Sequence, residues 1–237
     1  MNSKPGSLTV RRLTFPLILL ALALLVGCQS VPRSTLASHN SKPWEREIAA
    51  FEASDKTNSP PHGCIVFVGS SSIRLWKSLA QDFPSLPVVN RGFGGSQLAD
   101  SVNFAPRIVI PYAPRQVVIY AGGNDLNAGK PADRGYGDFV ALARELHAAL
   151  PNTRLSYIAS APNLARWAQV DQVKKLNQLI AGYCRSHDMD FIDIFPLMLG
   201  PDSHPLPDIY VSDGLHMNAK GYSIWTKAVT PKLLPNP

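Results

Sequence analysis

Four short segments of the 237-residue sequence carry side chains suited to nucleophilic catalysis. In chain order they are Gly69-Ser-Ser-Ser72, Gly92-Phe-Gly-Gly95, Gly122-Gly-Asn-Asp125 and Asp213-Gly-Leu-His216. Acyl transfer needs a hydroxyl activated by a base, a group that orients the base, and hydrogen-bond donors for the tetrahedral oxyanion. The residue types in these segments can supply every one of those parts.

Each part can be matched to a residue type in the segments. A serine at the start of a helix presents its hydroxyl at a loop and offers its own backbone N–H. Gly95 lets a second N–H approach closely, and the Asn124 side chain supplies a third donor. His216 is a base suited to neutral pH, and Asp213, three residues earlier, can hold its other ring nitrogen. The four segments together predict serine-dependent acyl transfer.

Each segment taken alone has a simpler interpretation. A serine before a helix is most often an N-cap, and Gly-Gly-Asn-Asp and Asp-Gly are common turn sequences. The joint occurrence of all four segments favours the chemical interpretation. Among the six histidines, His216 alone stands in an Asp-x-x-His context, and His204, from a proline-rich loop, is the one competing base.

Other chemistries find little support in the residue pattern. The segment from Gly92 is not a G-x-G-x-x-G fingerprint, because its last position is Gln97, and no G-x-x-x-x-G-K-[ST] phosphate loop is present. No spacing of Cys and His residues fits a zinc site. We therefore expect neither a metal nor a cofactor. Trp167, in a polar stretch, is a candidate for an aromatic side chain that faces the substrate.

From Gly63 onward the chain alternates short apolar runs with longer amphipathic segments, which is typical of a parallel sheet joined by helices. The predicted strands are Cys64–Val68, Val88–Asn90, Gln116–Ala121, Arg154–Ala159 and Asp190–Ile194. We therefore predict an α/β fold, a three-layer α/β/α sandwich with a five-stranded parallel sheet, in one domain over residues 44–237. Sites in such sheets lie at the carboxyl ends of the strands, where the first three segments fall.

Helical spacing of apolar residues predicts the connecting helices. They are a first helix beginning near Trp44, a short helix after Ser71, and helices at Gln97–Ala105, Gly137–Leu150, Asp171–Arg185 and Ala219–Leu234. Pro231 should end or kink the last of them. Loops 91–104, 125–136 and 161–171 are expected to line the substrate pocket.

The order and spacing of the four segments resemble the SGNH (GDSL-like) hydrolase superfamily, whose motif blocks carry Ser, Gly, Asn and Asp-x-x-His. The resemblance covers about residues 63–226 and implies a flavodoxin-like sheet and a serine esterase. Position by position, it implies Ser71 as nucleophile, with His216 as its base and Asp213 orienting the base. The N–H groups of Ser71 and Gly95 and the Asn124 amide would form the oxyanion hole.

One position departs from the family pattern. The usual Gly-Asp-Ser reads Gly69-Ser70-Ser71 here, which leaves Ser70 as the alternative nucleophile. The departure also supports a second hypothesis, a catalytically silent binding protein of the cell envelope that kept the fold, because a fold alone never determines a function. For an active enzyme the resemblance implies an ester of a small molecule, a glycan or a lipid as substrate, and the sequence does not choose among these.

The N-terminus is typical of a targeting segment. Lys4, Arg11 and Arg12 precede an apolar run, Leu13–Val26, that is too short to span a membrane comfortably. The run ends in Leu-Val-Gly-Cys28, which resembles the lipobox of bacterial lipoproteins. We therefore expect a signal peptide at 1–27, lipid attached to Cys28, and an exported protein anchored to a bacterial membrane, by resemblance the outer membrane facing the periplasm.

Composition adds two expectations. Residues 28–43, polar and rich in Ser and Pro, are expected to form a tether. Beyond residue 27 the chain carries 20 basic and 17 acidic side chains, a net charge of +3 that gives no reason to expect a nucleic-acid partner. Cys64 and Cys184 should lie too far apart for a disulfide and should serve as small buried side chains.

Overall fold

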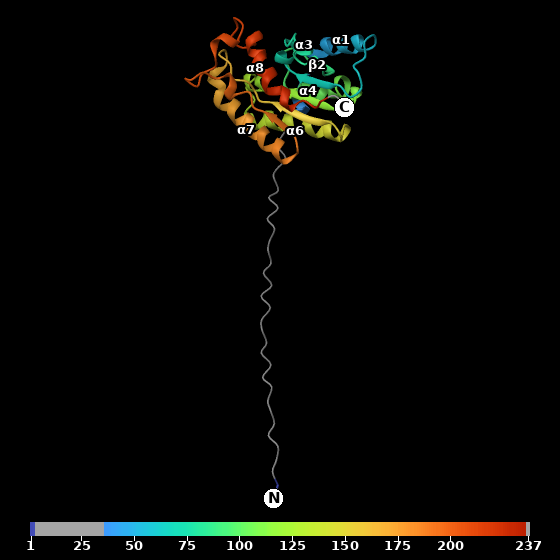
Figure 1. The fold of residues 1–237 in the computed structure, drawn as a ribbon, viewed down its shortest axis with the longest axis vertical. Helices are drawn as coiled ribbons and strands as arrows, with labels where there is room; N and C mark the ends of the chain where they lie inside the picture. Colours follow the sequence, from blue (N-terminus) through green and yellow to red (C-terminus); the bar gives the residue numbers. More distant parts are fainter. Residues whose placement is uncertain (3–35, 236–237) are drawn as a thin grey trace. The chain divides into compact units, whose positions relative to one another are not determined.

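The computed structural model describes residues 1–2 and 36–235 (Figure 1). Nearly all of the expected signal peptide, the lipidation site Cys28 and residues 29–35 of the tether therefore lie outside the described residues. Within the described part of the chain, no helix is long and apolar enough to cross a membrane.

A five-stranded sheet, all of its pairings parallel, forms the centre of the fold in the order β2-β1-β3-β4-β5. The strands are β1 Ile65–Gly69, β2 Val88–Gly92, β3 Gln116–Tyr120, β4 Arg154–Ile158 and β5 Asp190–Ile192. All five predicted strands are present, with ends shifted by at most two residues. The strand order is that of flavodoxin-like sheets, which confirms the predicted fold class.

The sheet is buried on both faces. In β1, Val66 and Val68 belong to one hydrophobic cluster, whereas Ile65 and Phe67 belong to the cluster on the opposite face. Because successive side chains of a strand point to opposite faces, a strand covered on both sides needs apolar residues at every position. This explains why the strands read as continuous apolar runs in the sequence.

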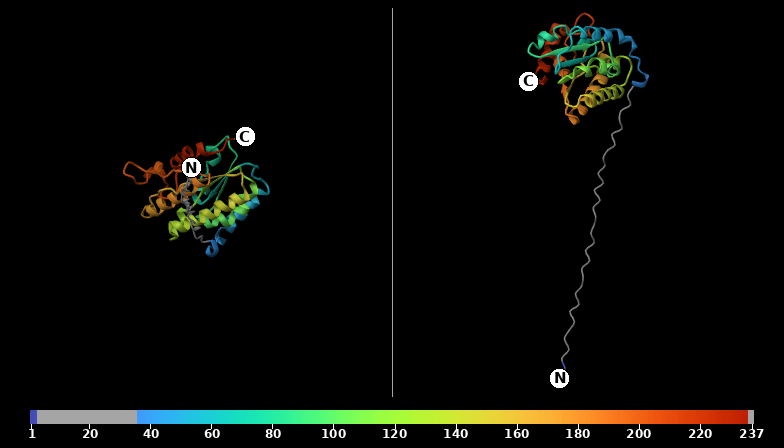
Figure 2. Two further views of the ribbon diagram at one scale, coloured as in Figure 1. Left: turned by 90° about the horizontal axis from the view of Figure 1, so that it is seen from below. Right: turned by 90° about the vertical axis from the view of Figure 1, so that its right-hand side faces the viewer.

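Helices cover the two faces and form the outer layers (Figures 1 and 2). On the Val66 face lie α1 Glu45–Asp55, α4 Leu98–Ile108, α6 Ala132–Ala149 and α7 Val170–Ser186. On the Phe67 face lie α2 Ser71–Arg74, α3 Leu79–Asp82 and α8 Ala219–Val229, while the short α5 Gly123–Asn127 follows β3. The predicted three-layer sandwich is therefore confirmed. Single 3₁₀ turns occur at Leu36–Ser38, Lys42–Trp44, Ile110–Tyr112, Trp167–Gln169, Pro196–Met198, Pro207–Ile209 and Thr230–Lys232.

Helix ends differ from the prediction by three residues or more in α4, α6 and α8. Helix α4 ends at Ile108, three residues beyond the predicted Ala105. Helix α6 begins at Ala132, five residues before the predicted Gly137. The prediction began too late because Gly135 and Gly137 weaken the helical pattern of the first turns in the sequence. The segment 125–136, predicted as a loop, is therefore largely helical. Helix α8 ends at Val229, and Pro231 lies in the 3₁₀ turn that follows, as expected for proline.

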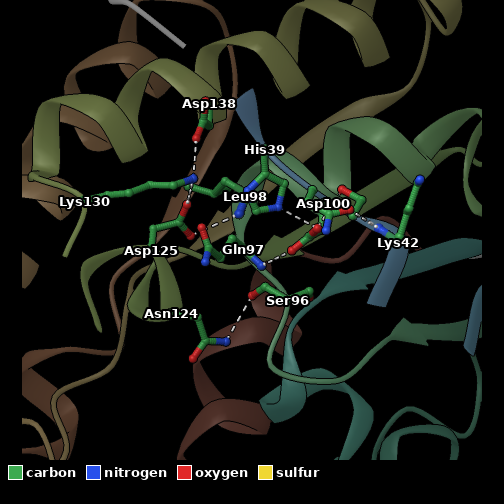
Figure 3. Close-up of polar contacts among 12 residues, drawn as sticks. His39, Lys42, Ser96, Gln97, Leu98, Asp100, Asn124, Asp125, Lys130 and Asp138 are labelled. Carbon is green, nitrogen blue, oxygen red and sulfur yellow. Dashed lines mark hydrogen bonds and ion pairs between the residues drawn. The ribbon is translucent and has the colours of Figure 1, made fainter. Parts of the chain in front are cut away.

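The last residues of the expected tether contact the folded part of the chain. His39 Nε2 lies 2.7 Å from Asp100 Oδ1 (Figure 3). The Ser41 hydroxyl donates to the same oxygen at 2.7 Å. Asp100 is almost fully buried, so these two polar side chains satisfy a carboxylate that water cannot reach. Composition alone could not show this contact, since its partners are about 60 residues apart. Cys64 and Cys184 are both free and buried.

Candidate active site

Ser71 occupies a sharp turn at the carboxyl end of β1. Gly69 has a φ of +142°, and a Cβ there would lie 1.8 Å from the Tyr120 carbonyl oxygen, so only glycine fits. The chain then passes through Ser70, in extended conformation, into α2, whose first residue is Ser71. At this position the Ser71 N–H has no acceptor within its own helix, and among the described residues it donates to no other backbone group.

Ser71, His216 and Asp213 form a continuous hydrogen-bonded chain. His216 Nε2 lies 2.9 Å from Ser71 Oγ, and His216 Nδ1 lies 2.6 Å from Asp213 Oδ2. A proton on Nδ1, donated to the carboxylate, leaves Nε2 as the acceptor that faces the serine hydroxyl. The arrangement is that of a nucleophile, a base and a group that orients the base.

Asp213 is held as a carboxylate. The hydrogen bond from the His216 ring and the backbone N–H groups of His216 and Leu215 lower the pKa of Asp213 to about 2. Those N–H groups donate to Oδ1 at 2.9 and 2.8 Å, so that Oδ2 is left for the imidazole. The turn therefore keeps the Asp213 side chain ionised and orients its Oδ2 toward the His216 ring.

The alternatives that the sequence left open lie in different surroundings from Ser71 and His216. The buried Ser70 occupies the N-cap position of α2 without a side-chain capping bond, and its backbone N–H donates to the Tyr120 carbonyl oxygen. The Ser71 hydroxyl contacts His216. His204 is exposed, and its hydrogen bond goes to the Asp202 backbone. The Trp167 ring lies 5.3 Å from the His204 ring, and Trp167 does not line the cavity beside Ser71.

The remaining two predicted residues adjoin each other at the same edge of the sheet. A Cβ on Gly95 would lie 3.8 Å from Asn124 Nδ2, so the glycine backbone and the amide are neighbours. Among the described residues, the Gly95 N–H donates to no hydrogen-bond acceptor. Asn124 Nδ2 donates to the Ser96 carbonyl oxygen at 3.0 Å, which uses one of its two hydrogens (Figure 3).

A buried charge cluster forms around Asp125, the residue that follows Asn124. The adjacent Asp125 is fully buried, accepts from the Leu98 N–H at 3.0 Å and lies 3.1 Å from Lys130 Nζ (Figure 3). Lys130 Nζ also lies 2.9 Å from Asp138. Burial raises the pKa of Asp125 to about 6, against the lowering effect of Lys130. Sequence reasoning missed this cluster, although Asp125 directly follows a predicted site residue.

The cavity beside Ser71 is small, and both polar and apolar residues line it. Its volume is about 30 Å³, and it is lined by Ser70, Ser71, Ser72, Tyr120, Gly123, Asn124, Ala161, Asn163, Arg166, Gln169, Val173 and Leu215. Of the three predicted pocket loops, 161–171 contributes to the lining, whereas 91–104 and 125–136 do not. A larger cavity of about 450 Å³ lies between α1, α3 and β2 and contains none of the predicted site residues. Size therefore does not identify the site here, whereas the Ser71–His216 contact does.

No group of three or more His, Cys, Asp or Glu side chains is placed to hold a metal ion in the described part of the chain. The arrangement at Ser71 can bind a carbonyl compound, remove a proton from its own hydroxyl and offer donors to a developing oxyanion.

Comparison with models of protein families shows which family the chain belongs to. A model of the GDSL-like lipase/acylhydrolase family matches residues 63–224, and the chain therefore belongs to this family. The family implies ester hydrolysis as the general activity. The match spans all four segments that sequence analysis singled out. No curated protein matched the chain in a sequence search.

Solved structures share the fold at low sequence identity. A Streptococcus pneumonia protein described as a candidate platelet activating factor is 19% identical, with 81% of this chain and 94% of that chain covered and a TM-score of 0.72. A GDSL-like lipase from Bacteroides thetaiotaomicron is 22% identical, with coverage of 81% and 96% and a TM-score of 0.64. A variant of an acetyl-xylooligosaccharide esterase from Geobacillus Stearmophilus is 15% identical, with coverage of 73% and 95% and a TM-score of 0.59.

Proposed function

We propose that this protein is a serine esterase that cleaves carboxylic esters of short acyl groups through an acyl-Ser71 intermediate. The observation that carries the proposal is the 2.9 Å contact between His216 Nε2 and the Ser71 hydroxyl, with Asp213 on the other ring nitrogen. Family membership supports ester cleavage in general, and the geometry supports these three residues as the ones that perform it.

In the first half-reaction, Ser71 Oγ attacks the ester carbonyl carbon while His216 Nε2 accepts the hydroxyl proton. The carbonyl oxygen becomes an oxyanion that accepts from the Ser71 and Gly95 N–H groups and from Asn124 Nδ2. The tetrahedral intermediate then collapses, the bond to the alcohol oxygen breaks, and His216 returns its proton to the leaving alcohol. Asp213 stabilises the imidazolium form between these two transfers.

In the second half-reaction, water takes the place of the alcohol. His216 accepts a proton from the water as its oxygen attacks the acyl carbon, and the same donors bind the second oxyanion. Collapse breaks the bond to Ser71 Oγ, and His216 returns the proton to the serine. The acid product leaves, and the resting contact between Ser71 and His216 is restored.

The size of the cavity supports a small acyl group, such as acetyl. A space of about 30 Å³ next to Ser71 suits a few heavy atoms and is too small for a fatty chain. The hydroxyl, amide and guanidinium groups of Ser71, Asn124 and Arg166 in its lining can bind a hydrophilic alcohol, such as a sugar hydroxyl. One structural neighbour is named as an acetyl-xylooligosaccharide esterase, which is in keeping with this substrate class.

We propose that the enzyme acts in the cell envelope. The basic residues, the apolar run and Leu-Val-Gly-Cys28 support export and lipid attachment at Cys28, with removal of residues 1–27. Lipid at the mature N-terminus would hold the enzyme on a membrane, by resemblance the outer membrane on its periplasmic side. Acetylated envelope glycans are then substrates within reach.

A series of nitrophenyl esters tests the proposed function. The full-length protein in detergent should hydrolyse the acetate ester fastest, the butyrate ester more slowly and the octanoate ester scarcely at all. A rate that rises with chain length would contradict the short-acyl proposal. The absence of hydrolysis for every ester would instead favour the catalytically silent binding protein, for which the missing Gly-Asp-Ser aspartate is the supporting observation.

A further inference from the structure

Arg166 lies beside the proposed oxyanion donors, where neither the four segments nor the family pattern placed a residue. It belongs to the loop that follows β4 and lines the cavity next to Ser71. Its Nη1 donates to Asn124 Oδ1 at 2.9 Å and, more weakly, to the Gly123 carbonyl oxygen at 3.4 Å. The guanidinium therefore contacts the amide on the side opposite to Ser96.

The loop that carries Arg166 is itself fixed. The Arg166 N–H donates to Asn163 Oδ1 at 2.9 Å, and the Ala165 N–H donates to the Gly214 carbonyl oxygen at 3.0 Å. Gly214 lies between Asp213 and His216, so this loop is tied to the segment that holds the base. These two hydrogen bonds hold the Arg166 backbone in place, and the second of them also joins its loop to the segment of Asp213 and His216.

The charge of Arg166 is not neutralised by a carboxylate. Within the described residues, no Asp or Glu lies at ion-pair distance from its guanidinium, whereas the buried Arg91 has such a partner in Asp55. Partial burial lowers the pKa of Arg166, but an arginine side chain stays protonated in proteins. A positive charge at this place is favourable to any anion that forms next to Asn124.

We propose that Arg166 is a positioning residue for the oxyanion hole, acting through the Asn124 amide. A side-chain amide can flip by 180°, which would present its oxygen, rather than its N–H, to the oxyanion. Arg166 donates to Oδ1 while the Ser96 carbonyl oxygen accepts from Nδ2, so both contacts select the orientation in which the second N–H faces the cavity. The charged hydrogen bond to Oδ1 also makes that N–H a stronger donor.

This inference rests on the proposed function, and it predicts which kinetic constant a substitution of Arg166 should change. Because the oxyanion exists only in the transition state, loss of Arg166 should lower kcat and leave KM nearly unchanged. For Arg166→Met we expect kcat to fall by about 10- to 100-fold, less than the loss of the donor itself, with KM within about 3-fold. Arg166→Lys keeps a cationic donor and should recover part of kcat.

The test uses steady-state kinetics of the full-length protein on nitrophenyl acetate. Arg185→Met is the matched control, because Arg185 is exposed in the last turn of α7 and does not line the cavity beside Ser71, so it should change neither constant. In a double-mutant cycle, adding Arg166→Met to Asn124→Ala should lower kcat by no more than about 2-fold. Losses that multiply, or a change confined to KM, would show that Arg166 contacts the substrate directly and would overturn the positioning role.

A spectroscopic readout separates this inference from the proposed function. The NMR signals of the Asn124 side-chain amide, identified by their loss in Asn124→Ala, should shift or broaden in Arg166→Met and stay in place in Arg185→Met. If the wild-type protein hydrolyses no ester, the proposed function fails, and these signals still report whether Arg166 holds the amide. Unchanged signals in Arg166→Met would overturn the inference even in an active esterase.

Discussion

His216 Nε2 lies 2.9 Å from Ser71 Oγ, although 145 positions of the chain separate the two residues. Ser71 is placed by the turn at the end of β1, and His216 by the loop before α8. The contact therefore exists only when the sheet and the last helix have both packed. It also defines which of three consecutive serines should be the nucleophile.

Ser71→Ala should abolish ester hydrolysis, with kcat reduced by roughly 1000-fold or more, because no other hydroxyl of the described residues contacts His216. The fold should survive, since the Ser71 side chain is partly exposed and packs little. Steady-state kinetics on nitrophenyl acetate measure the loss of kcat, and circular dichroism shows whether the variant is folded. Ser70→Ala should keep most of the activity, and the reverse pattern would assign the nucleophile to Ser70.

Asn124→Ala should lower kcat by roughly 100- to 1000-fold with little change in KM, because the amide binds the oxyanion and not the ground-state carbonyl. Initial rates over a range of ester concentrations separate the two constants. An increase in KM without a fall in kcat would mean that Asn124 binds the substrate instead.

Asp213→Asn should lower kcat by about 1000- to 10,000-fold, because the amide can no longer hold the imidazole in its orientation or stabilise its charged form. The pKa of Asp213 is about 2, so in the wild-type enzyme its carboxylate stays ionised throughout the pH range of ordinary assays. The acid limb of the wild-type pH–rate profile should therefore reflect a group other than Asp213. A variant with the full wild-type rate would show that Asp213 is only a turn residue.

Asp125 should make stability depend on pH. Its pKa is raised from 3.8 to about 6 by burial, so the folded protein binds a proton more tightly than the unfolded chain. The stabilisation by the protonated form is complete below about pH 4 and is lost as the pH rises through about 6. Asp125→Asn, which keeps a neutral acceptor for the Leu98 N–H, should remove this dependence.

Urea unfolding of the wild type and Asp125→Asn between pH 4 and 7 measures the effect. Relative to the variant, the wild type should lose up to about 3 kcal/mol over this interval, the upper bound set by a shift of roughly two pKa units. Lys130 and Asp138 face the same carboxylate and are present in both proteins, so their own contributions largely cancel. Parallel pH curves for the two proteins would contradict the assignment.

Cys28→Ala tests the proposed membrane anchor. In a bacterial host that processes lipoproteins, the wild-type protein should sediment with the membrane fraction and carry a mass increase from lipid on its first residue. The variant should lack the lipid, and residues 1–27 should remain uncleaved because the processing depends on the lipidated cysteine. A wild-type protein with no lipid in its mass spectrum would rule out the anchor.

Local sequence patterns were sufficient for most of the fold. Continuous apolar runs such as Ile65–Gly69 indicated strands buried on both faces, and helical spacing indicated the helices between them. The four polar segments could be placed at the carboxyl ends of strands or before the last helix because parallel connections leave no other arrangement. Helix α6 is where local patterns were insufficient, since its first two turns contain Gly135 and Gly137, whose burial depends on neighbours elsewhere in the chain.

What the sequence by itself determined was the set of residues able to do the chemistry, since motif, spacing and strand order are all local or topological properties. Tertiary structure alone decided which serine meets His216, that Arg166 contacts Asn124, that Asp100 is satisfied by His39, and that the cavity is small. Each of the three contacts joins residues more than 40 positions apart. Such contacts depend on how whole elements pack, because a side chain can point to its partner only after the backbones of both have been fixed.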